Sequence, residues 1–324
     1  MRVAFMGSPD FAVPCLRALA GAHEVKLVVS QPDKPAGRGI QLTAPAVKLA
    51  AEELGLPVIQ PKSAKTGELR DALAGSGAEL AVVVAYGKIL PRAVLEAVPR
   101  GCINVHASIL PKYRGAAPVQ WAVINGEAET GVAIMQLDEG MDTGPVLLER
   151  RVAIDPEETS GELLARLAPI GAAALLEAIE EISAGTARPR SQDPAAASHA
   201  PMLTKADGTI DFSAPAAAVA ARIRGVDPWP GAQASHRGQI IKLFRARAED
   251  DPTGNISLPG HVLAIDPAGM RVATGQGVVV IRDIQAAGRK RMTVAQFAAG
   301  RGIAIGDQLG NPEMPRNPPR GVIP

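Results

Sequence analysis

Aromatic residues and cysteines are scarce in this chain of 324 residues. Phe, Tyr and Trp make up 3% of it and hydrophobic residues 47%, so its core has to be built mainly from Ala, Val, Leu and Ile. The two cysteines, Cys15 and Cys102, stand far apart and form no Cys-x-x-Cys pair. This excludes a disulfide framework and is typical of a protein that works in the reducing cytoplasm.

The chain also lacks the patterns of a metal centre and of a membrane protein. Its five histidines are scattered without the spacing of zinc ligands, so we expect no metal. No apolar run approaches the roughly 18 residues that span a bilayer. The N-terminus runs directly into a Gly-Ser-Pro-Asp turn and does not have the form of a signal peptide. We therefore expect no membrane partner.

Neither charge is in clear excess, because the formal net charge is +1. The distribution is nevertheless uneven. From Lys205 onward the chain carries 15 Lys and Arg against 10 Asp and Glu, and before Lys205 it carries 19 against 23. A basic second half attached to an acidic first half is a weak indication of a polyanionic partner.

The first half of the chain alternates short apolar runs with helical patterns. Residues 79–85 form a run rich in valine that is typical of a strand buried on both faces, as in a parallel sheet. Further strands are expected at residues 2–6, 24–30, 57–60, 101–105, 130–137 and 145–154, and helices at 46–54, 68–73, 160–183 and before residue 20. This alternation predicts an α/β fold with a Rossmann-like, doubly wound, mostly parallel sheet.

The composition changes near residue 184, where a stretch rich in Ala, Pro, Ser and Thr begins. One helix at 216–225 and several short strands separated by turn residues follow, which predict a small β-barrel. The expected boundaries are residues 1–188 for the first domain, 189–206 for a linker, 207–310 for the barrel and 311–324 for a proline-rich tail.

The strongest functional signal lies in residues 102–118, Cys-Ile-Asn-Val-His-Ala-Ser-Ile-Leu-Pro-Lys-Tyr-Arg-Gly-Ala-Ala-Pro. Asn104 and His106 are two apart near the end of an expected strand, so their side chains point to the same face. Ligands of open α/β sheets bind at such strand ends. A third polar residue, Asp142, lies in a later Gly-Met-Asp-Thr-Gly turn.

These three residue types suit acyl transfer to an amine. That reaction needs oriented reactants and hydrogen-bond donors for the oxyanion of a tetrahedral intermediate. A protonated His106 and the Asn104 amide would be the donors, while the Asp142 carboxylate would favour the imidazolium and help to remove the proton of the amine. Each residue alone also has an ordinary interpretation: a structural histidine, an amide that caps a turn, and an aspartate in a turn.

Further motifs extend along nearly the whole chain. They are F-M-G-S-P-D-F, Q-P-D-K-P-A-G-R-G, V-V-A-Y-G-K-I-L-P, N-V-H-A-S-I-L-P-K-Y-R-G-A-A-P and D-E-G-M-D-T-G in the first half, and L-T-K-A-D-G-T-I-D-F, I-R-G-V-D-P-W-P-G and G-D-Q-L in the second. With these motifs the chain resembles the methionyl-tRNA formyltransferases, within the wider family of 10-formyltetrahydrofolate-dependent formyltransferases. The resemblance implies 10-formyltetrahydrofolate as the formyl donor and methionyl-initiator tRNA as the acceptor.

The resemblance also implies which residues form the site. The catalytic trio of the family falls on Asn104, His106 and Asp142. The folate-contacting loop falls on Ser108, Ile109, Leu110 and Pro111. The pteridine pocket would be lined by Ile89, Leu90 and the backbone around Asp142.

A tRNA-binding surface is implied in the same way. Residues 34–50 carry Lys34, Arg38 and Lys48 with no acidic residue, which on its own indicates an ordinary solvated loop. By the resemblance, this loop enters the acceptor end of the tRNA, with Arg38 as the main contact and Lys34 as support. Lys205 in the linker would add a contact, and the second domain resembles an oligonucleotide-binding (OB-like) barrel. We expect a monomer.

Three other functions are compatible with parts of the sequence pattern. The first alternative is another folate-dependent formyltransferase that acts on a small amine and would use the same trio. A nicotinamide-dependent oxidoreductase is suggested by the Rossmann-like pattern, but Gly7-Ser8-Pro9 is no Gly-x-Gly-x-x-Gly motif. A non-catalytic RNA-binding module would not need the trio.

Overall fold

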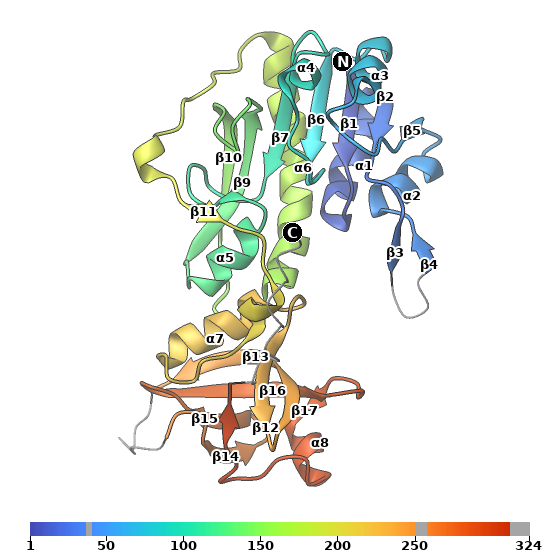
Figure 1. Cartoon of the computed structure of the whole chain (residues 1–324). Coiled ribbons are helices and arrows are strands. Elements are labelled where there is room, and N and C mark those ends of the chain that lie inside the picture. Colours follow the sequence, from blue (N-terminus) through green and yellow to red (C-terminus); the bar gives the residue numbers. More distant parts are fainter. Residues whose placement is uncertain (37–40, 251–257, 312–324) are drawn as a thin grey trace, which may run out of the picture. The chain divides into compact units, whose positions relative to one another are not determined.

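Two β-sheets, one in each half of the chain, organise the structure (Figure 1). This computed structural model describes residues 1–36, 41–250 and 258–311. The chain divides into two units. The first comprises Met1–Trp121, Ala128–Ile154 and Glu162–Met202, and the second comprises Ala122–Glu127, Asp155–Gly161 and Leu203–Pro324.

The first unit contains a seven-stranded sheet in the order β10-β9-β7-β6-β1-β2-β5. Its strands are β1 (Arg2–Gly7), β2 (Glu24–Val29), β5 (Val58–Ile59), β6 (Leu80–Val84), β7 (Cys102–His106), β9 (Glu129–Gln136) and β10 (Val146–Ala153). Strands β1, β2, β5, β6 and β7 run parallel, whereas β9 is antiparallel to β7 and β10 to β9. Strand β6 is buried along its whole length, which agrees with its apolar, valine-rich sequence.

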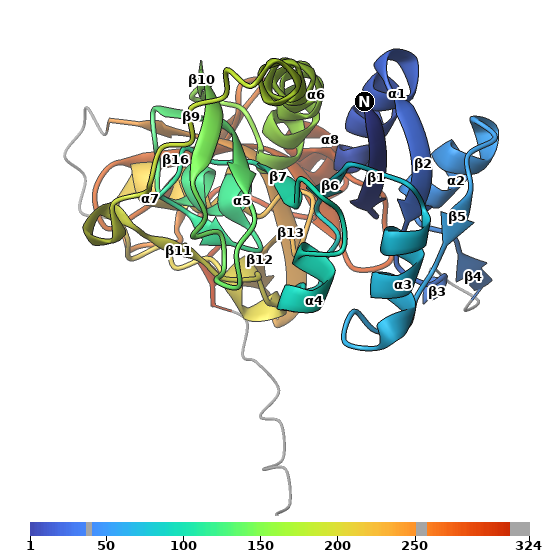
Figure 2. The ribbon, with the colours of Figure 1, turned by 90° about the horizontal axis from the view of Figure 1, so that it is seen from above.

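Helices cover both faces of this sheet. They are α1 (Val13–Ala22), α2 (Ala46–Glu53), α3 (Gly67–Gly75), α4 (Arg92–Leu95) and the long α6 (Ser160–Ala184). Figure 2 shows α1 and α6 on one side of the sheet and α3 and α4 on the other. On the second side, Leu69 and Leu73 of α3 and Val94 of α4 form one buried cluster with Met6 and Val83. The predicted doubly wound α/β fold is therefore confirmed.

The expected helices and strands of this sheet end within two residues of the observed ones. The short elements were not expected from the sequence. They are α4, α5 (Pro118–Ile124), the hairpin β3 (Lys34–Ala36) and β4 (Gln41–Thr43), and the parallel pair β8 (Arg114–Gly115) and β11 (His199–Ala200). Segments of two to seven residues are too short for hydrophobic periodicity to reveal.

The second unit is an antiparallel sheet in the order β14-β15-β16-β13-β12-β18, with β17 beside β16. The strands are β12 (Ala232–His236), β13 (Gln239–Glu249), β14 (Val262–Asp266), β15 (Gly269–Ala273), β16 (Val278–Ala286), β17 (Met292–Thr293) and β18 (Leu309–Gly310). Two helices, α7 (Ala216–Gly225) and α8 (Val294–Ala299), accompany them.

Hydrogen bonds join the two ends of this second sheet. The N–H of Leu309 donates to the carbonyl of Gly260 at 2.8 Å, and the N–H of Val262 donates to the carbonyl of Asp307 at 2.9 Å. Leu309 also pairs with His236 of β12. The sheet therefore curls into a barrel-like form, which confirms the expected small β-barrel domain. No helix in the described ranges is long and apolar enough to cross a bilayer.

Candidate active site

Strand β7 places two polar side chains on one face of the first sheet. Side chains alternate along a strand, so Val105 points to one face and Asn104 and His106 to the other. A Cβ atom on Gly171 of α6 would lie 3.1 Å from a methyl group of Val105. Helix α6 therefore packs on the face opposite to Asn104 and His106. Cys102 shares their face and packs in the cluster of α3 and α4.

The His106 ring is held between two acceptors. Its Nε2 lies 3.0 Å from the carbonyl oxygen of Tyr113, and its Nδ1 lies 3.7 Å from Oδ2 of Asp142. Because a carbonyl can only accept a hydrogen bond, we assign a proton to Nε2. The 3.7 Å separation is too long for a hydrogen bond but suits an ion pair with an imidazolium. The side chain is 6% exposed, so this pairing takes place almost out of contact with solvent.

The Asp142 carboxylate is oriented by the backbone conformation and by one hydrogen bond to its side chain. Its φ is 55°, in the left-handed region that aspartate adopts more readily than most residues with a side chain. Its Oδ2 accepts a hydrogen bond of 2.8 Å from the N–H of Gly115. In the same turn, Thr143 donates its hydroxyl to Asp138 at 2.6 Å. The oxygen that faces His106 is therefore held in place by the main chain.

The side-chain amide of Asn104 has N–H donors that are available to a ligand. Its backbone pairs with Val83 of β6 on one side and Met135 of β9 on the other. The residue is 9% exposed, and its side chain makes no hydrogen bond within the residues that the structure describes. The structure thus brings His106 and Asp142 together and places Asn104 on the same strand face as His106.

The loop after β7 folds back over that face. Ser108 donates its hydroxyl to the carbonyl of Lys112 at 2.7 Å. Leu110 packs against Ala133 and Met135, which are the strand partners of His106 and Asn104. Leu110 and the next residue, Pro111, also line a cavity of about 250 Å³ in the first unit. Ile109, between Ser108 and Leu110, is half-buried.

Ile89 and Leu90 follow β6, the neighbour of β7. Leu90 is buried, whereas Ile89 is 71% exposed and presents apolar surface. Their neighbour Lys88 donates to the carbonyls of Pro61 and Lys62 at 3.0 and 2.8 Å. Burial lowers the pKa of Lys88. Through its side chain, the residue just before the two predicted pocket residues is therefore joined to residues 61–62.

Known families match both halves of the chain. The family model described as formyl transferase matches residues 1–179, and that of the formyl transferase C-terminal domain matches residues 202–302. A methionyl-tRNA formyltransferase of Desulfotalea psychrophila is 50% identical over 304 residues, covering 94% of each chain. One of Heliobacterium modesticaldum is 48% identical, covering 96% of this chain and all of the relative. The chain belongs to the methionyl-tRNA formyltransferase family.

Solved structures of proteins with lower sequence identity share the fold. HypX of Aquifex aeolicus, solved with tetrahydrofolic acid, superposes with a TM-score of 0.63 and 18% identity over 94% of this chain and 48% of its own. The sugar 3N-formyl transferase WlaRD, solved with dTDP and 5-N-formyl-THF, superposes with a TM-score of 0.67 and 16% identity. The match covers 90% of this chain and 99% of WlaRD. These likenesses show a shared fold. The close relatives and the family models show a formyl transferase, so the oxidoreductase interpretation is wrong for this chain.

The predicted tRNA contacts of this formyltransferase fall in three places. Lys34 begins β3 and is exposed. Arg38 lies outside the described residues. Lys205 is exposed at the start of a 3-10 helix (Lys205–Gly208) in the second unit.

Across the described ranges, no cluster of three or more His, Cys, Asp or Glu side chains is placed to bind a metal ion.

The third basic residue of the predicted loop, Lys48, has a structural partner. Its Nζ lies 2.8 Å from Oδ2 of Asp33, just before β3. Gln60 donates to the other oxygen of Asp33 at 2.7 Å and to the carbonyl of Gln31 at 2.8 Å. The hydrogen bond from Gln60, and then Lys48, lower the pKa of Asp33. In this methionyl-tRNA formyltransferase, Lys48 therefore anchors the base of the β3–β4 hairpin.

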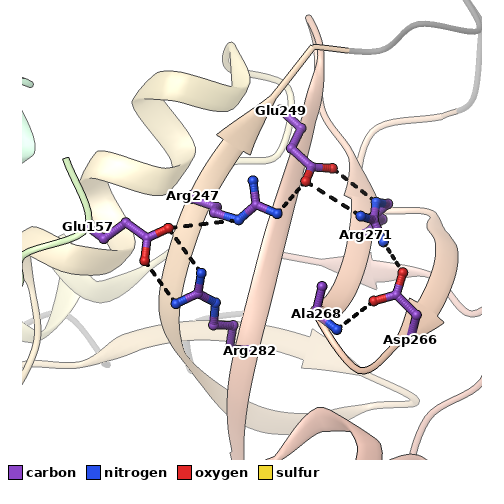
Figure 3. Close-up of polar contacts among 7 residues, drawn as sticks. All are labelled: Glu157, Arg247, Glu249, Asp266, Ala268, Arg271 and Arg282. Carbon is purple, nitrogen blue, oxygen red and sulfur yellow. Dashed lines mark hydrogen bonds and ion pairs between the residues drawn. The ribbon is translucent and has the colours of Figure 1, made fainter.

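Many arginines of the second sheet are also paired with carboxylates. Figure 3 shows a row of alternating charges across its strands. Glu157 accepts two hydrogen bonds from Arg282, of 2.8 and 3.0 Å, and Arg271 donates to Glu249 at 3.0 Å. Arg247 contacts both Glu157 and Glu249. The paired arginines are partly neutralised, so fewer of them are open to phosphates than the basic composition predicts.

The sequence did not reveal the groups that hold His106 and Asp142 in place. The carbonyl of Tyr113 and the N–H of Gly115 lie within the recognised motif, but backbone groups leave no signal in residue type. Gln192 lies in the expected linker, yet its side chain donates to the carbonyls of Asp142 and Gly144. No local pattern around Gln192 pointed to this contact.

Proposed function

We propose that this formyltransferase transfers the formyl group of 10-formyltetrahydrofolate to the α-amino group of methionine esterified to initiator tRNA, giving formylmethionyl-tRNA for translation initiation. The nitrogen of the amine attacks the formyl carbon, the bond from that carbon to N10 breaks, and N10 takes up a proton as tetrahydrofolate leaves. The observation that supports this best is the placement of His106 between the Tyr113 carbonyl and Asp142, beside an unpartnered Asn104 amide.

Asn104, His106 and Asp142 have separate roles in this proposal. The Asn104 amide and the Nδ1–H of the His106 imidazolium, which lies 3.7 Å from Asp142 and makes no hydrogen bond to it, donate to the oxyanion of the tetrahedral intermediate. The negative charge of that oxyanion is what most needs stabilisation. Asp142 orients the His106 ring, and it accepts the proton of the attacking amine directly or through water. An α-amino group has a reference pKa near 8, so a fraction is neutral at pH 7 and no nucleophile of the protein is required.

The formyl donor would lie against the loop after β7. Ser108, Ile109, Leu110 and Pro111 form the proposed folate contacts, with Ile89 and Leu90 at the pteridine. Support comes from Leu110, which packs over the strand partners of the trio, and from the exposed apolar side chain of Ile89. The folate supplies the formyl group, and no metal is proposed.

The tRNA would be held by basic residues. Arg38 and Lys34 of the β3–β4 hairpin segment are the proposed contacts for the acceptor end, and Lys205 of the linker is a further contact. We propose that the protein acts as a monomer in the cytoplasm. The proposed domain boundaries remain residues 1–188, 189–206, 207–310 and 311–324, of which the last lies mostly outside the described residues.

A formylation assay tests the whole proposal. The protein is incubated with 10-formyltetrahydrofolate and either methionyl-initiator tRNA, methionyl-elongator tRNA or a sugar-nucleotide amine. We expect formylmethionine from the initiator tRNA in large excess over the other two acceptors. Product from the small amine alone would replace this function with the alternative, and tRNA binding without turnover would remove the enzymatic role.

A further inference from the structure

Gln192 reaches from the expected linker into the active-site turn. Its Nε2 donates to the carbonyl of Asp142 at 2.9 Å and to the carbonyl of Gly144 at 2.7 Å. These two carbonyls flank Thr143. Both N–H bonds of the Gln192 amide are therefore used on the segment that carries the Asp142 carboxylate.

The oxygen of the same amide is also occupied. Oε1 of Gln192 accepts from Nε and Nη2 of Arg114, at 3.1 and 2.7 Å. Arg114 is 7% exposed, and buried guanidinium groups are stable only when their donors are satisfied. Next to it, Gly115 donates its N–H to Oδ2 of Asp142. The contacts thus form a closed ring that runs from Asp142 through residues 114–115 and Gln192 back to Asp142.

This ring lies at a turn whose backbone needs support. Asp142 has a positive φ, which is unfavourable for a residue with a side chain. Gly144 fits only because it lacks a Cβ, which would lie 2.0 Å from the carbonyl oxygen of Gln136. Gly115 is also closely packed, since its Cβ would lie 2.7 Å from the carbonyl oxygen of Ala200. Small rotations at this turn would move the carboxylate relative to His106.

We propose that Gln192 is a positioning residue for Asp142: its amide fixes the turn so that the carboxylate faces Nδ1 of His106. The inference rests on the role proposed for Asp142 in the reaction. Gln192 itself touches neither reactant in this account, so its loss acts on the step in which Asp142 takes part. A displacement near 1 Å in an active site can cost about 100-fold in rate.

The test compares two substitutions that remove different parts of the ring. Gln192→Ala removes all its contacts, whereas Gln192→Glu keeps an acceptor for Arg114 but cannot donate to the two carbonyls. For both variants we expect kcat to fall at least about 10-fold, while KM for the folate and for the tRNA stays within about twofold. The matched control is Gln276→Ala, since Gln276 is exposed and its side chain makes no hydrogen bond within the described residues.

A double-mutant cycle separates positioning from general stability. If Gln192 acts through Asp142, Gln192→Ala lowers kcat by less than about twofold in an Asp142→Asn background. Two results would overturn the inference and leave the proposed trio intact. One is a double variant whose fold loss in kcat equals the product of the losses in Gln192→Ala and Asp142→Asn. The other is an unchanged kcat in Gln192→Ala and Gln192→Glu. An unchanged kcat in Asp142→Asn alone would overturn the trio, and the inference with it. Melting temperatures identify a variant that has lost its fold, and Gln192→Glu then carries the test.

Discussion

Nδ1 of His106 lies 3.7 Å from Oδ2 of Asp142, although the two residues belong to β7 and to the turn between β9 and β10. In the antiparallel pairing of β9 with β7, Gln136 at the end of β9 lies opposite Ile103 near the start of β7. The turn that follows β9 therefore folds back along β7 to place Asp142 beside His106. The ring is fixed on its other side by the Tyr113 carbonyl. A charged ring would therefore be oriented from both nitrogens, with its position set before a substrate binds.

Removal of either proposed oxyanion donor should slow the reaction. We expect His106→Ala and Asn104→Ala each to lower kcat by about 10²–10³, the usual cost of one such donor. Binding of tRNA should change little, because neither side chain is proposed to contact it. Steady-state kinetics and a tRNA-binding assay on the same preparations check this, with melting curves as the control for folding. Unaltered turnover would exclude the residue from the mechanism.

Replacement of Arg38 should affect tRNA use and not the folate. We expect Arg38→Ala to raise KM for methionyl-tRNA or lower kcat/KM for it, with KM for the formyl donor unchanged, because a phosphate contact is lost. Arg70→Ala is the matched control, since Arg70 lies on α3 and pairs with Asp71 on the surface. Kinetics equal to those of the parent at every tRNA concentration would show that Arg38 has no role in recognition.

Much of the first unit could be predicted because its signals are local. The valine-rich run at β6 and the alternation around it fix strands and helices within two residues. Asn104 and His106 could be selected for the same reason, since their common face follows from their spacing on one strand. The ring of hydrogen bonds around Asp142 could not be predicted, because Gln192 and Gly115 contact Asp142 only in the tertiary structure. The pairing of β8 with β11, which brings Gly115 against Ala200, is likewise a contact between distant segments.

The charges of the second unit show the same limit. Composition predicts a basic surface from Lys205 onward, but it does not reveal which charges are paired. Arg282 is bound by Glu157, from a segment that the sequence assigns to the first domain. A count of charges therefore overestimates the number of arginines that are open to a polyanion, since it ignores their pairing with carboxylates from other parts of the chain.

The two thiols should resist modification in the folded protein. Burial raises the pKa of Cys15 and of Cys102 to about 12 each, and both side chains are nearly inaccessible. The reactive thiolate is therefore scarce at neutral pH. We expect a thiol reagent at pH 8 to react slowly with the native protein and rapidly with two groups in denaturant. Rapid native reaction of Cys102 would show that β7 is more open than described.

Acid should weaken the base of the β3–β4 hairpin through Asp33. The pKa of this carboxyl is lowered by its hydrogen bond with Gln60 and by Lys48. A lowered pKa means that the stabilising contribution is present above the unfolded value of about 4 and is lost as the pH falls through the folded value. We expect Asp33→Asn to lower the free energy of unfolding at pH 7 and to lose this difference toward pH 3. Asp71→Asn, at a carboxylate whose side chain is 66% exposed, is the control in the same denaturation series. A difference between Asp33→Asn and the parent that stays constant with pH would show that the ionised Asp33 contributes nothing to folding.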